Sequence, residues 1–374
     1  MKILYIANIR LPTEKAHGIQ IMKMCEAFAH AGAEVELVVP NRRTPITEDP
    51  FDFYGVEHNF SITHIPILEF PLWIPGAFRL QTFIFSFTTA RWIKKNRTPD
   101  VIYMRGEVLL LLARLLPAPI KLIWETHIKP GHPRRYYTAV HKLLGVVAVT
   151  KYFANEIPIL WNISPEQVCY APDGVQVKAF NIRWSKNEVR EKLQLPINKK
   201  IVLYVGSDLP WKGLWYLRAA GELLPDEYLI VFVGPIKPDR NTSKKYVFAG
   251  VQPPQDVPLW LAAADILVLT GDPASEISKH YTSPMKLFEY LAAGKPIVAM
   301  NLPSFREILD ESTAYFAASN DPYNIAHAVQ KATDDSENTT VAARAKSLAE
   351  KYSWSVRGAH ILAFVEKRIA ASSI

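Results

Sequence analysis

The sequence has little cysteine. Among its 374 residues it contains only Cys25 and Cys169. Two cysteines are too few for a disulfide framework, and their spacing matches no zinc site. Such sparse use of cysteine is typical of a reducing compartment, so we expect a cytoplasmic protein. The chain also contains no Asp-x-Asp pair, a common metal-binding arrangement, and we expect it to need no metal.

Long uninterrupted apolar runs are missing as well. The first ten residues, MKILYIANIR, contain a short apolar run followed by polar residues, which predicts a first strand rather than a signal peptide. The most apolar stretches, residues 67–93 and 108–124, are interrupted by charged residues and prolines. A transmembrane helix needs about 20 mostly apolar residues, so we expect none.

The chain lacks the glycine fingerprint of dinucleotide-binding proteins. After its first predicted strand comes IRLPTEKAHG, in which Gly18 is the only glycine. The G-x-G-x-x-G motif uses three glycines to bring backbone close to a pyrophosphate. Its absence argues against a dehydrogenase that uses such a cofactor.

The segments that are present alternate between strands and helices. The length exceeds that of a single core, so two domains are expected. Strand-like runs in the first half are LYIANI, EVELVVP, ITHIPI, VIYMR, KLIWETH and VVAVT; in the second half they are IVLYVG, YLIVFVG, YVFAG, ADILVLT and PIVAM. This alternation predicts an α/β protein with two doubly wound parallel sheets. Residues 181–200 predict one exposed helix and a linker, and residues 354–374 predict an amphipathic helix.

Positive charge is concentrated in the first half. The net charge is +7, yet residues 79–135 alone hold eleven Lys/Arg and three acidic residues, among them Arg97 and Glu107. Leu80, Phe83 and Phe87, with Ile84, share one face of a predicted helix in this segment. Two interpretations stay open: the helix contacts anionic lipid headgroups, or it faces the core with solvated basic ends. No nucleic-acid-binding motif accompanies the charges, so we expect no nucleic-acid partner.

Residues 283–299, SPMKLFEYLAAGKPIVA, predict a helix with an anion site at its start. Ser283 is placed to cap the helix, with Pro284 at its first position and Gly294 ending it. Unpaired amides and the helix dipole favour an anion there. Glu289 lies about one and a half turns in, where a carboxylate can accept both hydroxyls of a sugar diol. The alternative is an ordinary capped helix before a buried strand.

A second segment, IVLYVGSDLPWKG at 201–213, joins a strand to a helix. It turns at Gly206 and ends in Lys212, at the edge where parallel α/β sheets bind ligands. A positive charge there can neutralise a leaving diphosphate. The alternative for Lys212 is a solvated loop lysine.

In order and spacing, these segments resemble the family 4 retaining glycosyltransferases (glycosyl transferases group 1) of the GT-B fold. The resemblance runs almost from end to end. Its motifs are the Gly18 loop, PDVIYMR, ETH, VVAVTKYFANEI, APDGVQVKAF, YVGSDLPWKG, FAGVQPPQDVPLWLAAADILVLT, the 283–299 block and KYSW. It implies two Rossmann-like domains facing across a cleft: residues 1–182 on the acceptor side, with helix 355–374 packing back on it, and residues 183–354 binding a nucleotide-sugar.

The resemblance also implies roles for individual residues. Lys212 would contact the diphosphate, and His127 would lie near the anomeric carbon of the sugar; these are the implied catalytic residues. Glu289 would hold the ribose. The other implied donor-binding residues are Gly18, Gly206, Ser207, Val251, Tyr281, Thr282, Ser283 and Met285. The base would lie near Gly234 and Gly250. No cofactor is implied, because the nucleotide-sugar is a substrate.

Two positions depart from the family pattern. Ser207 stands where the family often has a basic residue, so Lys212 carries more of the charge or another basic residue substitutes. Tyr281 stands eight positions before Glu289, where the family tends to have a glutamate that meets the donor hexose. Glu276 and His280 are close to it in sequence.

The implied reaction is a hexosyl transfer with retention at the anomeric carbon, in which a donor phosphate oxygen accepts the proton of the acceptor. Paired glycosidase-like carboxylates are then unnecessary. The acceptor would be a glycan or a lipid-linked molecule, in cell-surface polysaccharide or glycolipid synthesis at the inner face of a membrane. Two alternatives remain: a nucleotide-sugar epimerase, and a non-catalytic binding subunit at the membrane.

Overall fold

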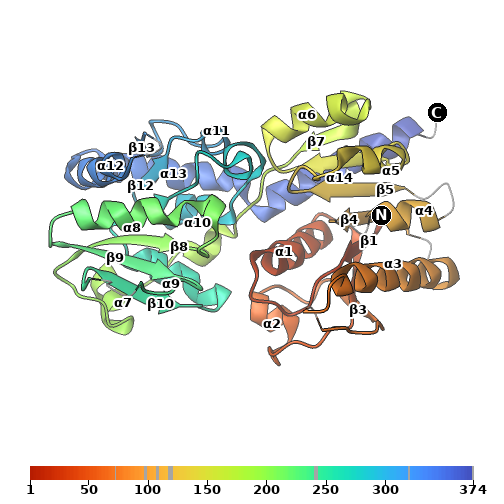
Figure 1. Cartoon of the computed structure of the whole chain (residues 1–374), viewed down its shortest axis with the longest axis horizontal. Helices are drawn as coiled ribbons and strands as arrows, with labels where there is room; N and C mark the ends of the chain where they lie inside the picture. Colours follow the sequence, from red (N-terminus) through yellow and green to blue (C-terminus); the bar gives the residue numbers. More distant parts are fainter. Residues whose placement is uncertain are drawn as a thin grey trace. The chain divides into compact units, whose positions relative to one another are not determined.

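The computed structural model describes residues 1–71, 73–96, 99–106, 109–116, 121–239, 243–318 and 321–372. Arg97 and Glu107 of the basic segment lie outside them. The chain divides into two compact units (Figure 1): Met1–Pro172 with Trp354–Ile374, and Asp173–Ser353. The sequence placed the first boundary after residue 182, whereas the chain changes unit after Pro172.

The first unit is built on a seven-stranded sheet in the order β3-β2-β1-β4-β5-β6-β7. All of its paired strands run parallel. The strands are β1 (Lys2–Ala7), β2 (Glu34–Pro40), β3 (Ser61–Ile65), β4 (Val101–Arg105), β5 (Leu122–Thr126), β6 (Gly145–Ala148) and β7 (Val168–Tyr170). The six strands expected from the sequence are present, and β7 was not expected.

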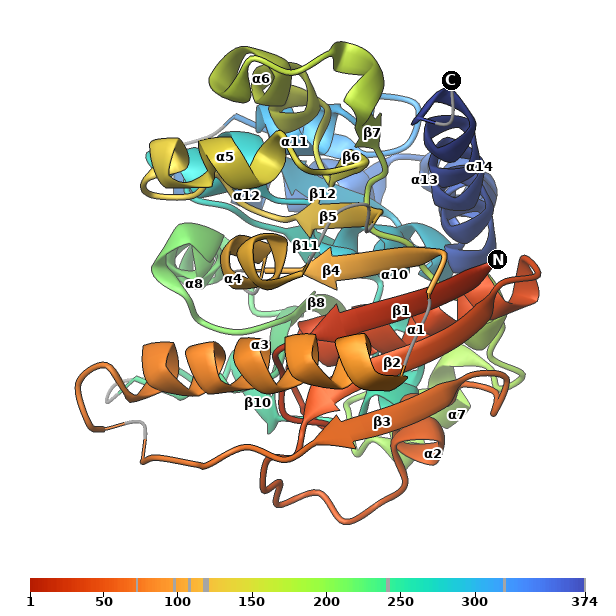
Figure 2. The ribbon, with the colours of Figure 1, turned by 90° about the vertical axis from the view of Figure 1, so that its right-hand side faces the viewer.

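Helices cover both faces of this sheet. They are α1 (Ala16–His30), α2 (Pro50–Tyr54), α3 (Ala77–Asn96), α4 (Leu109–Leu115), α5 (Tyr137–Val140), α6 (Lys151–Trp161) and α14 (Trp354–Ser372), with the short turns η1 (Pro133–Tyr136) and η2 (Pro165–Gln167). Helices α3, α4 and α5 pack in sequence on one side, and α1 packs with α14 on the other (Figure 2).

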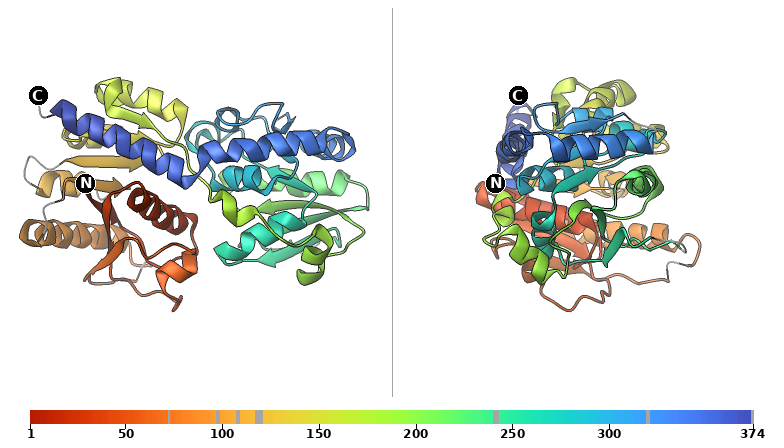
Figure 3. Two further views of the ribbon diagram at one scale, coloured as in Figure 1. Left: turned by 180° about the vertical axis from the view of Figure 1, so that it is seen from behind. Right: turned by 90° about the vertical axis from the view of Figure 1, so that its left-hand side faces the viewer.

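The C-terminal helix α14 completes the first unit (Figure 3). At Gly358 it approaches α1 so closely that a Cβ there would come within 2.9 Å of the Cβ of Ala27. Further along, the Phe364 ring fills the space beside Gly145 of β6. Arg368 Nε then donates to the Leu144 carbonyl at 2.9 Å. Small residues on α1 and β6 thus let the helix lie directly on the sheet layer.

Helix α3 turns the apolar stripe predicted from the sequence toward solvent. Leu80, Phe83 and Phe87 are 47%, 49% and 48% exposed. The buried face of α3 is instead made of Ala77, Gln81, Thr82, Phe85, Ser86, Thr89, Ala90 and Ile93. The core-facing interpretation of that apolar stripe is therefore wrong, because a different face of the helix, with Phe85, Ile93 and several small or polar residues, lies in the core.

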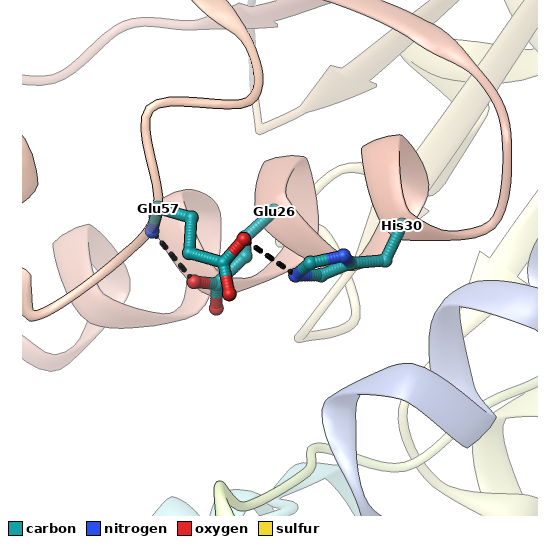
Figure 4. A group of neighbouring side chains, drawn as sticks. All are labelled: Glu26, His30 and Glu57. Atoms are coloured by element: carbon teal, nitrogen blue, oxygen red, sulfur yellow. Dashed lines mark hydrogen bonds and ion pairs between the residues drawn. The ribbon is translucent and has the colours of Figure 1, made fainter.

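A cluster of Glu26, His30 and Glu57 ties α1 to the turn after α2 (Figure 4). The Glu57 amide donates to Glu26 Oε1 at 2.8 Å, and His30 Nε2 lies 3.6 Å from Glu57 Oε2. Lys23 also pairs with Glu26 and donates to the Gly55 carbonyl. The carboxylates already have protein partners, so the cluster is explained as a surface contact between two helices.

The second unit contains a six-stranded parallel sheet in the order β10-β9-β8-β11-β12-β13. Its strands are β8 (Lys200–Val205), β9 (Tyr228–Val233), β10 (Tyr246–Gly250), β11 (Ile266–Leu269), β12 (Ile297–Met300) and β13 (Tyr315–Ala317). The five expected strands are present; the short edge strand β13 was not expected. The α/β prediction of two doubly wound parallel sheets is confirmed.

The helices of the second unit also flank their sheet. They are α7 (Lys186–Lys192), α8 (Leu214–Leu223), α9 (Val257–Ala263), α10 (Met285–Ala293), α11 (Pro303–Arg306), α12 (Pro322–Asp334) and α13 (Asn338–Ala349), with the turns η3 (Val177–Phe180), η4 (Pro210–Lys212), η5 (Pro254–Asp256), η6 (Ile277–Tyr281) and η7 (Glu350–Tyr352). Helix α8 packs on α12, and α10 packs on α9 and α13. Among the described residues, no helix combines the length and apolar character needed to cross a bilayer.

The region expected to be a linker is part of this second unit. Helix α7 begins with a capping box between Ser185 and Glu188. Its Arg190 is only 2% exposed and pairs with Asp265 at 2.6 Å. Asp265 also accepts the Ile201 amide, so α7 is fixed to the start of β8. The exposed helix predicted for residues 181–200 is present as α7, and the buried pairing of Arg190 makes this stretch part of the second unit rather than a linker between units.

Candidate donor site

The loops after β8 and β9 approach each other very closely. The Gly206 amide donates to the Val233 carbonyl at 2.8 Å, and the Gly234 amide donates to the Gly250 carbonyl at 2.8 Å. A Cβ on Gly234 would lie 1.9 Å from the Gly206 carbonyl oxygen, a distance no side chain can occupy. Gly206 and Gly234 have φ of +145° and +137°, which suits glycine. The two loops therefore form one rigid edge at the carboxyl ends of the strands.

Lys212 lies beside this edge. Its Nζ donates to Ser207 Oγ at 2.8 Å. Thr270 Oγ1 donates to the Lys212 carbonyl at 2.7 Å, which fixes the backbone at this point. Gly213 follows with φ +58°, and a Cβ there would meet the Gly271 carbonyl oxygen at 2.6 Å. Burial lowers the pKa of Lys212. Lys212 is thus a positioned, partly buried cation, which is not the solvated loop lysine of the alternative.

Helix α10 begins one residue later than the sequence suggested. Pro284, rather than Ser283, is the N-cap residue, and no side chain caps the helix. The Ser283 hydroxyl instead accepts the Asp173 amide at 3.0 Å. The capping prediction is wrong because Ser283 serves a contact distant in sequence. The start of α10 is therefore without a side-chain acceptor, which favours an anion there. Gly294 ends the helix with φ +62°, as expected.

Glu289 lies in the second turn of α10, with part of its surface accessible. Burial raises the pKa of Glu289 to about 7, and the positive charge of nearby Lys286 opposes that rise. Lys286 in turn feels the charges of both Lys212 and Glu289. The charges of Lys212 and Glu289, from separate segments, thus both act on Lys286.

Sequence reasoning missed Lys286. It lies one helical turn before Glu289, so the two share a face of α10. Its side chain is 9% exposed, and its Nζ lies 3.8 Å from the centre of the Tyr204 ring. A charged residue at the second position of a mostly buried helix was the available signal in the sequence.

The remaining residues near α10 have the following places. Tyr281 ends the π-helical turn η6 and is 8% exposed. Thr282, Ser283 and Met285 are partly buried. Glu276, with a side chain 64% exposed, pairs with Lys279 and lies 3.9 Å from His280. These surface contacts give no support for Glu276 as a replacement for the glutamate that Tyr281 displaces.

Two predicted donor contacts have different surroundings. Gly18 lies inside α1, and a Cβ there would meet the Tyr54 hydroxyl at 2.3 Å and Thr13 Cγ2 at 2.7 Å. The structure therefore gives Gly18 a packing reason within the first unit. Val251 follows β10 and is 55% exposed. It lies next to Gly250, whose carbonyl accepts the Gly234 amide.

His127 follows β5 in the first unit, where a buried carboxylate orients it. Its Nε2 lies 2.6 Å from Glu125 Oε1. Glu125 is fully buried; it also accepts hydrogen bonds from Gln20 and Tyr103 and pairs with Arg357 of α14. Burial alone would raise the pKa of Glu125, but Arg357 and His127 hold it well below its usual range. The ring nitrogen facing this carboxylate therefore carries the proton.

Comparison with solved structures places this architecture in the GT-B class of glycosyltransferases. Anabaena Alr3699/HepE in complex with UDP and glucose superposes with a TM-score of 0.74, at 16% identity, covering 98% of this chain and 100% of that one. WaaG, a glycosyltransferase of lipopolysaccharide biosynthesis, superposes with a TM-score of 0.69, at 15% identity, covering 97% and 98%.

Family models identify the chain more closely. The model described as "Glycosyltransferase Family 4" matches residues 18–179, and the model described as "Glycosyl transferases group 1" matches residues 199–335. Together they span most of both units, and the chain belongs to this family of group 1 glycosyltransferases. The resemblance in sequence and the GT-B fold are confirmed.

Curated relatives match at low sequence identity. A putative teichuronic acid biosynthesis glycosyltransferase, TuaC of Bacillus subtilis (strain 168), is 29% identical over 47% of this chain and 43% of its own length. The D-inositol 3-phosphate glycosyltransferase of Xylanimonas cellulosilytica is 22% identical over 92% of this chain and 90% of its own length. The match thus spans less than half of TuaC but nearly all of the second relative.

Proposed function

We propose that this protein transfers a hexosyl group from a nucleotide-sugar to a glycan or lipid-linked acceptor. The observation that carries the proposal is a chain of contacts: Lys212 donates to Ser207, Ser207 accepts from Tyr204, and the Tyr204 ring contacts Lys286 on the face of α10 that also holds Glu289. A cation for a diphosphate and a carboxylate for a diol are the groups that such a donor requires. The name of the HepE complex, with UDP and glucose, supports a donor of this chemistry.

The proposed chemistry retains the configuration at the anomeric carbon. The bond from that carbon to the diphosphate oxygen breaks, and a bond to the acceptor oxygen forms on the same face. The acceptor proton passes to an oxygen of the departing diphosphate, so no protein base is needed. Lys212 stabilises the charge that develops on the diphosphate, and Glu125 orients His127 in the first unit. We propose that the reaction requires no divalent metal.

A panel of nucleotide-sugars with UDP, GDP and ADP groups tests donor binding through thermal stabilisation, because a ligand that binds the folded state raises Tm.

Lys212→Ala is expected to lower transfer roughly 10²- to 10³-fold, the usual effect of removing one preorganised contact. The matched control is Lys331→Ala, which removes an exposed lysine from α12. Wild-type turnover in Lys212→Ala would contradict the proposal. Loss of activity in chelator, restored by Mn²⁺, would contradict metal independence.

We further propose that the acceptor is reached at an anionic membrane surface. The exposed apolar residues Leu80, Phe83 and Phe87 of α3 support this proposal, together with Phe78. Lys94 and Lys95 are exposed at the end of the same helix. Apolar side chains beside cations suit the interface of a bilayer with anionic headgroups. The cell-wall polysaccharide role in the name of TuaC fits such an acceptor.

Vesicle flotation tests the membrane proposal. The protein is expected to float with phosphatidylglycerol vesicles at low salt and less at high salt, because ions screen the attraction. The variant Leu80→Ser/Phe83→Ser is expected to lose flotation while keeping its Tm, since both side chains are about half exposed. The control, Ile159→Ser, changes an apolar residue of α6 that is 85% exposed. Equal flotation of all three proteins would contradict a role for α3.

A further inference from the structure

Lys286 is a buried cation that lacks a hydrogen-bond partner. Its Nζ is buried and donates to no acceptor among the residues that the structure describes. It lies over the face of the Tyr204 ring, 3.8 Å from the ring centre. A cation–π contact offsets part of the cost of burying an ammonium group, but it satisfies none of the three N–H donors. Buried polar groups normally have partners, so this one needs an explanation.

The surroundings of Lys286 define the missing partner as an anion. Burial lowers its pKa well below the ordinary value, and the positive charge of Lys212 lowers it further. Two cations are thus held close together near the start of α10, where no side chain caps the helix amides. An anion beside both lysines would remove their mutual repulsion and give Lys286 its acceptors.

We propose that Lys286 is the second cation of the donor diphosphate site, in place of the basic side chain that position 207 lacks. The proposal rests on the transferase function proposed above. Ser207 Oγ accepts from Lys212 Nζ, and the Tyr204 ring beneath Lys286 donates its hydroxyl to the Ser207 carbonyl at 3.3 Å. Position 207 and Lys286 therefore both contact the Tyr204 side chain, one from the loop after β8 and the other from α10. The positive charge of Lys286 on α10 would thus bind the same diphosphate that a basic side chain at position 207 would bind.

Calorimetric titration of Lys286→Met with UDP, and with GDP and ADP, tests the proposal. Methionine keeps an unbranched side chain that is one atom shorter, and it removes the charge. Affinity for the nucleoside diphosphate is expected to fall about 10- to 100-fold, the effect of losing one charge-assisted hydrogen bond. Affinity for the nucleoside alone should stay within about twofold, because it has no phosphate. The control is Lys295→Met, which removes a partly buried lysine just beyond the other end of α10.

A second variant separates a binding role from a structural one. Ser207→Arg, added to Lys286→Met, is expected to recover most of the diphosphate affinity, because it returns a cation to the same space. Failure of wild-type protein to bind any nucleoside diphosphate would contradict the proposed function itself. Tight wild-type binding with no loss in Lys286→Met would overturn only the inference. A loss seen with UDP-glucuronate but not with UDP would also overturn it, since the cation would then meet a sugar carboxylate.

Discussion

At the scale of single residues, two glutamate carboxyl groups are buried away from water, and their surroundings shift their pKa values in opposite directions. Glu289 has its pKa raised to about 7 by burial. Glu125, also buried, has its pKa held below the usual range because Arg357 and His127 surround it. The same side-chain type thus behaves in two ways: the carboxyl group of Glu289 titrates near neutral pH, and the carboxylate of Glu125 stays ionised and holds His127 in place.

Glu289→Gln is expected to change the pH dependence of donor binding. In the wild type, affinity should rise between about pH 6 and pH 8, because the ionised carboxylate is the better acceptor for a diol and forms as the pH passes about 7. The variant cannot ionise, so its affinity should be lower at pH 8 and flat across the range. Titration calorimetry at three pH values measures this. A wild-type profile as flat as that of the variant would exclude Glu289 from the ribose site.

Glu289→Gln should also alter stability without ligand. Folding raises the pKa of Glu289 from 4.5 to about 7. As the pH rises through this interval, the unfolded state ionises more readily than the folded state, so the free energy of unfolding decreases. The variant is therefore expected to unfold at higher denaturant concentration than the wild type at pH 8, and at the same concentration at pH 4. A difference of equal size at both pH values would show that packing, rather than ionisation, is responsible.

Glu125→Gln is expected to destabilise the first unit by about 3–5 kcal/mol, because it leaves Arg357 buried without its counter-charge. The carboxylate has a lowered pKa, so its contribution is present above the unfolded pKa of 4.5 and disappears as the pH falls below it. Urea unfolding at pH 7 and pH 3 measures both effects. The control, Glu156→Gln, changes a partly exposed carboxylate paired with Lys129. A loss that is the same at both pH values would contradict this account.

At the scale of elements, glycines allow the closest contacts. Gly234→Ala is expected to abolish nucleotide binding, because its Cβ would collide with the Gly206 carbonyl oxygen. Gly32→Ala, in the first unit, is a matched control: its φ of +91° is also unfavourable for alanine, but nothing lies within 4 Å of the new Cβ. The control should lose roughly 1–2 kcal/mol of stability and keep its affinity. Equal affinities in both variants would mean that the loop contact does not shape the site.

Helix α14 offers a second test of close contact. Gly358→Leu is expected to lower the free energy of unfolding by about 1–3 kcal/mol, because it forces α14 away from Ala27 of α1. Ala363→Leu enlarges an exposed position of the same helix and should have little effect. Chemical denaturation followed by tryptophan fluorescence compares them. Similar midpoints for both variants would show that α1 and α14 can separate without cost.

The sequence predicted most elements and failed at identifiable places. Strands of four or more residues with continuous apolar character were predictable, whereas β7 and β13, each three residues long, carry too little pattern. Helix α3 was predicted as a helix, but its apolar face is on the outside. Lys212 and Glu289 could be found from turn and helix signals. For Lys286 the sequence offered one signal, a charge in a mostly buried helix, but its contact with the Tyr204 ring forms only on folding.

At the scale of the whole molecule, the two units divide the proposed tasks. The predicted diphosphate and ribose residues all lie within Asp173–Ser353. In the presence of UDP, amide hydrogen exchange is therefore expected to slow mainly around β8, η4 and α10. The largest expected increase in the free energy of opening is the stabilisation that binding gives, about 2.7 kcal/mol when the UDP concentration is 100 times Kd. Protection found only in strands of the first unit would contradict the placement of the donor site.

Because α14 belongs to the first unit, that unit is assembled from two separate segments, Met1–Pro172 and Trp354–Ile374. During translation, β1 to β7 leave the ribosome well before the helix that fills the space against Ala27 and Gly145. The second unit is synthesised in one continuous piece, so it can finish folding first. A premature stop codon that removes α14 should then yield a chain whose middle is native while its beginning is a target for proteases.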